Sequence, residues 1–164
     1  MSTGSPVLQS GIVTPGHLVA WTTDGIIQDA GVTFANTYGV FSSAILGVNF
    51  NAPNTDNAIQ IALPSGYTRY RVDAVMLSGA NATLTTATCG LFTSTGGSGA
   101  TIVTGGTAIT VSQTGVDAVN NLQFFTLQNQ NTIAYSDTVL YFRVFGAQGS
   151  AATGNVTINY KPLP

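Results

Sequence analysis

The sequence predicts an all-β fold: a single jelly-roll-like β-sandwich of about eight strands, preceded by an extended N-terminal arm. Residues that favour helices are scarce, because the 164-residue chain has no Glu and one Lys, whereas Gly, Thr, Ser, Val and Ile are frequent. From Ala58 onward, short runs of β-branched and aromatic residues recur between clusters of Gly, Asn and Ser, a spacing typical of a sandwich or small barrel. We therefore expect an arm at residues 1–57 and a sandwich domain at residues 58–164.

Alternating side chains and turn-forming boundaries place the strands of the sandwich. In the run from Tyr67 to Leu77, alternation is expected to put Tyr70, Val72, Ala74 and Met76 on one face. A long loop at about 112–121 suits a crossing between two sheets, as in a jelly roll. An immunoglobulin-like sandwich is the alternative, although its Cys–Trp–Cys pattern is absent. The expected strands are 58–63, 67–77, 84–92, 101–111, 122–127, 132–135, 138–146 and 155–160.

Residues 1–57 have a different pattern, because Pro6, Pro15 and several Gly interrupt apolar clusters that are shorter than a typical strand. We interpret this segment as an extended arm that becomes ordered by docking on a partner. Within it, residues 35–50 are apolar and uncharged, and are either a first pair of strands or a segment buried against a neighbour. The predicted partner-binding residues are Val7, Leu8, His17, Leu18, Trp21, Ile26 and Ile27.

The charge content predicts subunit contacts. Charged residues make up 6% of the chain, against roughly 25% in ordinary domains. With 44% hydrophobic residues and a mean hydropathy of +0.29, part of the surface is expected to be covered by other subunits. A monomer solubilised by hydroxyl and amide groups is the alternative. The strand at 138–146 is apolar on both faces apart from Arg143, so we predict a homotrimer with Val139, Tyr141 and Phe145 in its interface.

The sequence offers little for catalysis. Its single His, His17, has Asp24 and Asp29 nearby in the chain, but no nucleophile motif accompanies them. Without Glu there is also no pair of acids that includes the Glu typical of many sugar-cleaving enzymes. We therefore expect a protein that is not an enzyme, in which His17 makes a hydrogen bond or an interface contact.

No metal, cofactor or nucleic acid is expected as a ligand. The nearest cluster of oxygen ligands, Asn54, Asp56 and Asn57, lacks the Gly and the bidentate acid of a calcium loop, so a turn is the preferred interpretation. The Gly-rich run at 96–101 lacks the Lys and Ser/Thr of a phosphate-binding loop and is expected to form a hairpin tip. Four scattered basic residues and a net charge of −2 leave no basic patch for nucleic acid.

The N-terminus and the single cysteine bear on localisation. Met1 to Ser10 has neither the basic start nor the apolar stretch of a secretory signal, and no apolar run is long enough for a membrane helix. Cys89 lies in an apolar, Thr-rich run and is expected to be a buried free thiol. We expect synthesis in a reducing cytoplasm and no contact with a membrane.

Residues 6–31, PVLQSGIVTPGHLVAWTTDGIIQDAG, resemble N-terminal segments of small structural proteins of tailed bacteriophages. The charge-poor β region that follows is similar in style to the jelly-roll capsid decoration, or cement, proteins of these phages. That resemblance implies a virion protein, made in the host cytoplasm, that binds the capsid surface as a homotrimer and locks neighbouring major capsid subunits. The N-terminal segment also resembles head-fibre and tail-fibre proteins, so a short fibre or spike component that binds host glycan is the alternative. The chain has no shaft repeat and no second domain to favour a fibre.

Overall fold

The structure, a computed structural model, describes residues 8–9, 17–21, 26–33, 39–112, 121–129 and 132–163. The chain divides into two compact units, Met1–Val40 and Phe41–Pro164. Within the described residues, no helix is long and apolar enough to cross a membrane.

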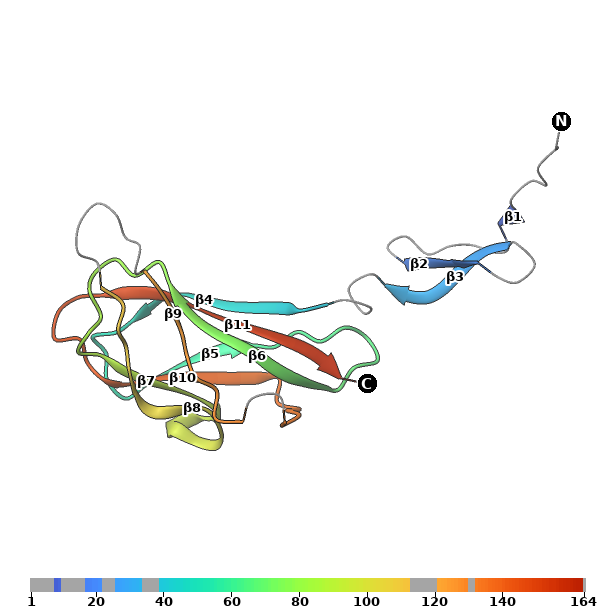
Figure 1. The fold of residues 1–164 in the computed structure, drawn as a ribbon. Coiled ribbons are helices and arrows are strands. Elements are labelled where there is room, and N and C mark those ends of the chain that lie inside the picture. Colours follow the sequence, from blue (N-terminus) through green and yellow to red (C-terminus); the bar gives the residue numbers. More distant parts are fainter. Residues whose placement is uncertain are drawn as a thin grey trace. The chain divides into compact units, whose positions relative to one another are not determined.

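The second unit is a β-sandwich of two four-stranded antiparallel sheets, which confirms the predicted all-β class (Figure 1). One sheet has the order β4-β11-β6-β9, and the other has the order β5-β10-β7-β8. The only described helical element is the short 3-10 turn η1 (Thr95–Gly97). The strands are β4 (Phe41–Asn49), β5 (Thr55–Gln60), β6 (Arg69–Ser78), β7 (Thr88–Ser94), β8 (Ser98–Ala108), β9 (Leu122–Phe124), β10 (Val139–Gly146) and β11 (Thr153–Leu163).

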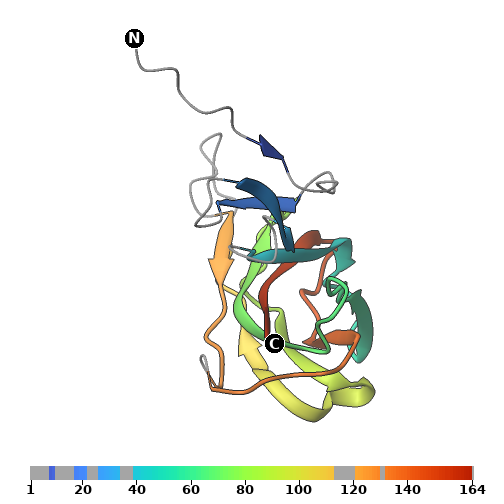
Figure 2. The ribbon, with the colours of Figure 1, turned by 90° about the vertical axis from the view of Figure 1, so that its right-hand side faces the viewer.

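Consecutive strands of the sandwich alternate between the two sheets. Among the described strands of the sandwich, β7 and β8 are the one consecutive pair that lies in the same sheet. They form a hairpin whose tip is η1, as expected from the Gly-rich run. As a result the first strand, β4, lies beside the last strand, β11, with Phe41 opposite Tyr160. Figure 2 shows the strands of both sheets surrounding the region between them, where the core lies.

The core is built from the inner faces of both sheets. Its buried members are apolar or aromatic, and no charged residue is buried among the residues described. Fully burying a large apolar side chain stabilises the fold by roughly 1.5–3 kcal/mol, so this cluster is the main source of stability. The buried phenol of Tyr160 remains hydrogen bonded, because it donates to the Ala62 carbonyl (2.8 Å) and accepts from the Ala62 amide (3.2 Å). The largest fully buried side chains are Tyr70, Tyr160, Phe50, Phe142, Ile59, Leu77, Leu84, Leu91, Ile102, Ile109, Leu140 and Ile158.

Two details of the sandwich differ from the sequence-based expectation. The sandwich begins at Phe41 and not at residue 58, because β4 pairs along β11 and β5 pairs along β10. The strand expected at 132–135 is absent: only Tyr135 pairs, in an isolated bridge with Tyr70, and residues 132–134 are exposed. The predicted loop at about 112–121 falls mostly outside the described residues.

A β-bulge in β6 changes which side chains face the core. Val72 pairs with Tyr160 and Ala74 pairs with Asn159, so Asp73 is an extra residue without its own partner on β11. The alternation therefore shifts by one residue: Tyr70 and Val72 point inward before the bulge, and Val75 and Leu77 point inward after it. Ala74 and Met76, expected on the face of Tyr70, lie instead on the outer face of the sheet.

The first unit contains a three-stranded sheet of order β1-β3-β2, built from β1 (Leu8–Gln9), β2 (His17–Trp21) and β3 (Ile26–Thr33). β1 runs parallel to β3, and β2 runs antiparallel to it. The apolar clusters that were expected in an extended arm thus pair with one another, and β3 reaches eight residues. The local sequence did not predict this because the pairing partners lie in different clusters.

Candidate functional site

The predicted partner-binding residues of the N-terminal segment lie on one small sheet. Leu8 is in β1, His17, Leu18 and Trp21 are in β2, and Ile26 and Ile27 are in β3. The register puts Trp21 opposite Ile27 and Leu8 opposite Ile26. Val7 lies outside the described residues. The sheet brings six of the seven predicted residues together, and their role in binding stays a prediction.

The predicted trimer residues Val139, Tyr141 and Phe145 are on β10, in the middle of the β5-β10-β7-β8 sheet, and alternate with the buried residues Leu140 and Phe142. All three are half-buried and belong to the outer face of that sheet. The structure therefore places all three side chains on one face, as alternation predicts. Phe145 packs against other side chains of the chain, whereas Val139 and Tyr141 border a hollow.

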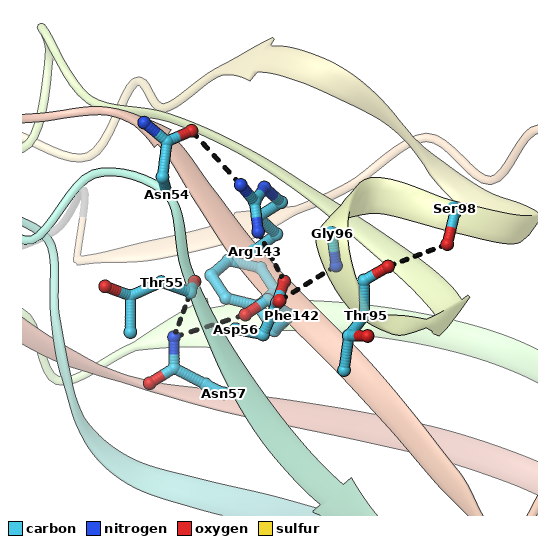
Figure 3. A network of polar contacts seen from close by, with 9 residues as sticks. All are labelled: Asn54, Thr55, Asp56, Asn57, Thr95, Gly96, Ser98, Phe142 and Arg143. Carbon is cyan, nitrogen blue, oxygen red and sulfur yellow. Dashed lines mark hydrogen bonds and ion pairs between the residues drawn. The ribbon is translucent and has the colours of Figure 1, made fainter.

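Arg143, on the same outer face, is held by a polar network (Figure 3). Its Nη1 donates to Asp56 Oδ1 at 3.0 Å, and its Nη2 donates to Asn54 Oδ1 at 3.1 Å. The other Asp56 oxygen accepts the Gly96 amide at 2.9 Å, which ties the tip of the β7–β8 hairpin to β5. The cluster weighed above as a calcium ligand set is therefore used internally, and no group of three or more possible metal ligands occurs in the described part of the chain.

Phe145 is already packed within its own chain. Its ring meets Phe92 edge-on at 5.8 Å, and the Arg143 guanidinium lies 5.5 Å from the Phe145 centroid. Glycines make room for this pair: a Cβ on Gly97 would lie 2.9 Å from Phe145, and one on Gly90 would lie 2.8 Å from Phe92. Phe145 consequently offers little free apolar surface, although its predicted role in a trimer is untested.

Val139 and Tyr141 border a shallow hollow of about 360 Å³. Its remaining lining comes from Thr93 at the end of β7 and from the segment before β10, and consists of Ser136, Asp137 and Thr138. The segment is fixed by hydrogen bonds through its backbone: the Tyr70 hydroxyl donates to the Asp137 carbonyl (2.9 Å) and the Ile61 amide donates to the Thr138 carbonyl (2.8 Å). The side chains are left exposed.

The outer face of the other sheet carries three of the five large hydrophobic side chains that are exposed among the described residues. Register places Ala44, Thr157, Met76 and Phe124 in one row across β4, β11, β6 and β9. Among the large side chains on this face, Leu46 is 75% exposed, Leu122 is 52% exposed and Phe124 is 60% exposed.

We call this surface the uncharged face; it comprises the outward side chains of Ser42, Ala44, Leu46, Ala74, Met76, Ser78, Leu122, Phe124, Asn155, Thr157 and Asn159. The charged side chains of these strands are gathered at the other end of the sheet. There Lys161 of β11 lies opposite Arg71 of β6 in the strand register, and Arg71 forms an ion pair with Asp73 at 2.7 Å.

Sequence reasoning did not single out the uncharged face. A signal was present for β9, because in Leu122-Gln123-Phe124-Phe125 large apolar residues fall on both faces of the expected strand. That is the same pattern that drew attention to β10. No comparable signal exists for Met76, because its outward position depends on the bulge at Asp73.

The ionisation of the buried groups does not suit nucleophilic chemistry. Burial raises the pKa of the Cys89 thiol to about 12, which keeps it protonated, whereas a nucleophilic thiol needs a lowered pKa. Burial also raises the pKa of Tyr70 and of Tyr135 above the ordinary value.

Comparison of the chain with protein-family models, with curated proteins and with solved structures found no match.

Proposed function

We propose that this chain is a structural subunit of a bacteriophage particle that decorates and stabilises the capsid, binding neighbouring major capsid subunits as a homotrimer. The observation that carries the proposal is the uncharged face, on which Leu46, Leu122 and Phe124 are more than half exposed with no charged side chain among them. Large apolar side chains exposed on a face without charge are typical of a contact with another protein.

Two further features support an assembly role. The chain carries four basic and six acidic residues, so its contacts must depend on apolar burial and neutral hydrogen bonds more than on ion pairs. The strand orders β4-β11-β6-β9 and β5-β10-β7-β8, with nearly every connection crossing between the sheets, support the comparison with jelly-roll decoration proteins.

In this proposal the two units have different roles: the N-terminal unit binds the shell, and the sandwich makes the contact between copies. The N-terminal unit, which contains Trp21 and resembles N-terminal segments of phage structural proteins, attaches to the shell. The uncharged face makes the contact between copies and takes the place of the β10 set, since Phe145 is occupied within the chain. A closed ring needs such a face to meet a different surface on the next copy.

Labelling of particles tests the proposal. Particles purified from host cells that carry this gene are labelled with an antibody against the chain and imaged in negative stain. We expect label distributed over the shell. Label confined to the tail, or particles without label, would overturn the assignment to the capsid.

A short head-fibre, tail-fibre or spike component that binds host glycan is the second candidate. One observation favours it: the hollow beside Tyr141 combines an aromatic ring with a carboxylate and hydroxyl groups. Label at the tail tip or on head fibres in the same experiment would favour this candidate.

A further inference from the structure

We infer that the hollow beside Tyr141 is a binding site for a neutral saccharide. This inference does not depend on the capsid proposal, because a shell protein and a fibre head could both carry such a site. The volume of about 360 Å³ is at the lower end of the range of ligand pockets, about 300–1,000 Å³, and suits a ligand of mono- or disaccharide size. The hollow is open and shallow, so a ligand would lie on it without being enclosed.

The lining combines the two kinds of group that a sugar needs. A sugar ring has an apolar face of C–H groups, which packs on an aromatic ring, and an edge of hydroxyl groups, which need hydrogen-bond partners. Tyr141 supplies the ring, and Val139 extends the apolar side of the hollow. Thr93, Ser136, Asp137 and Thr138 supply three hydroxyl groups and one carboxylate. The Thr93 hydroxyl already accepts the Ala100 amide at 2.9 Å and keeps its hydrogen to donate to a ligand.

The groups of the 136–138 segment are available to a ligand. Ser136, Asp137 and Thr138 are exposed, and no described residue forms an ion pair or a side-chain hydrogen bond with Asp137. The Tyr141 hydroxyl likewise has no hydrogen-bond partner among the described residues. A carboxylate can accept two hydroxyl groups of one sugar, which is a strong, oriented contact.

The backbone beneath these side chains is already held in place. The Tyr135 and Tyr70 backbones exchange hydrogen bonds of 2.8 and 2.9 Å, and the Tyr70 hydroxyl and the Ile61 amide hold the next carbonyls. A site that is ordered before binding loses less conformational entropy on binding. This fixed segment explains how exposed side chains can form a site on a connecting loop.

Charge determines the class of sugar. Asp137 is the only ionisable side chain in the lining apart from the Tyr141 phenol, and none of the lining residues is basic. A carboxylate without a neighbouring cation repels phosphate, sulfate, uronic acid and sialic acid groups. We therefore assign the site to neutral hexoses or N-acetylhexosamines.

Binding is tested with the full-length protein on an array of neutral and acidic oligosaccharides, followed by calorimetric titration of the best neutral sugar. We expect a neutral sugar to bind and Tyr141→Ala to weaken its binding at least about tenfold, whereas Tyr141→Phe, which keeps the ring, retains most of the affinity. Asp137→Asn, an exposed change that leaves the backbone contacts in place, should weaken binding by a similar factor.

Tyr67→Ala is the matched control, because Tyr67 is also half-buried but does not line the hollow. Thermal unfolding of each variant shows whether it is folded. Failure to bind any neutral sugar, binding only of acidic or amine-bearing ligands, or binding that Tyr141→Ala and Asp137→Asn leave unchanged would overturn the inference. Failure to bind sugar would also remove the observation that favours the fibre candidate, whereas the capsid proposal is tested separately by the labelling of particles.

Discussion

At the scale of single residues, Arg143 carries a charge that is mostly shielded from water and that depends on one acid, Asp56. Its side chain is 13% exposed, its Nε is buried without a hydrogen-bond partner in the described part of the chain, and Asp56 is the acid that compensates it. Because a charge that is mostly shielded from water destabilises the fold when it loses its partner, we expect Asp56→Asn to lower the free energy of unfolding by about 2–3 kcal/mol. Urea unfolding at neutral pH measures this loss.

The Arg71–Asp73 pair provides the matched control. Its side chains are 32% and 25% exposed, so water screens the pair more strongly. Asp73→Asn should therefore cost about 1 kcal/mol or less. Equal losses for Asp56→Asn and Asp73→Asn would show that the burial of Arg143 has no energetic consequence.

Tyr70 makes the fold sensitive to alkaline pH. Burial, reinforced by the Asp137 carboxylate, raises the pKa of Tyr70 above the ordinary value of 10.0. The folded state then holds the phenolic proton more tightly than the unfolded state, so this contribution to stability is complete below about pH 10 and is lost as pH rises further. Tyr135 has its pKa raised in the same direction.

Tyr70→Phe separates the two effects of the hydroxyl group. At pH 7 the variant lacks the hydrogen bond to the Asp137 carbonyl and should be less stable by about 1 kcal/mol. Above about pH 10 the wild type loses stability more steeply, so the difference should shrink and then reverse. Urea unfolding at several pH values measures both; a difference that stays constant to about pH 11 would contradict the assignment.

At the scale of elements, alternation predicted a strand where one face was clearly apolar, as in β11. It did not settle β4, because Phe41–Asn49 is rich in small residues and its pairing with β11 is a contact between distant parts of the sequence. Alternation also could not predict the bulge in β6, because Asp73 is an extra residue only in relation to the partner strand β11. β11 continues through Pro162 because β4 begins at Phe41, opposite Tyr160, so Pro162 has no partner on the β4 side, and an unpaired side tolerates proline.

The candidate surfaces were predictable to the same limited degree. The sequence identified Val139 and Tyr141 as outward residues of one strand. It could not place Thr93 and Asp137 beside them, because that arrangement depends on how β7 and β10 pair and on the hydrogen bonds that hold residues 135–138. Catalytic and metal-ligand sets would have had recognisable spacings, whereas a saccharide site or a protein contact has none.

At the scale of the whole molecule, the uncharged face predicts association. We expect the 16.8 kDa chain to sediment as a trimer at micromolar concentration and Phe124→Lys to sediment as a monomer. Lys suits an exposed edge strand such as β9, so the variant should remain folded, while its charge cannot be buried in an apolar contact. Sedimentation velocity measures the change, and thermal unfolding checks the fold.

Ile133→Lys is the control for this experiment. Ile133 is 36% exposed but lies outside the strands of the uncharged face, so its variant should remain a trimer. A wild-type monomer would overturn the trimer, and a trimer that persists in Phe124→Lys would place the contact on another surface.

The pairing of the first strand of the sandwich with the last has a mechanical consequence. Phe41 lies opposite Tyr160, and Asn49 at the far end of β4 lies opposite Thr153, so the chain enters and leaves the sandwich at the same end of this ladder. A pulling force applied between residue 41 and the C-terminus would open the ladder one pair at a time, as in unzipping, and would not shear all of its hydrogen bonds at once. Unzipping needs less force than shear. In the proposed assembly, a subunit anchored through its N-terminal unit would unzip along this ladder only when its C-terminus also carried load.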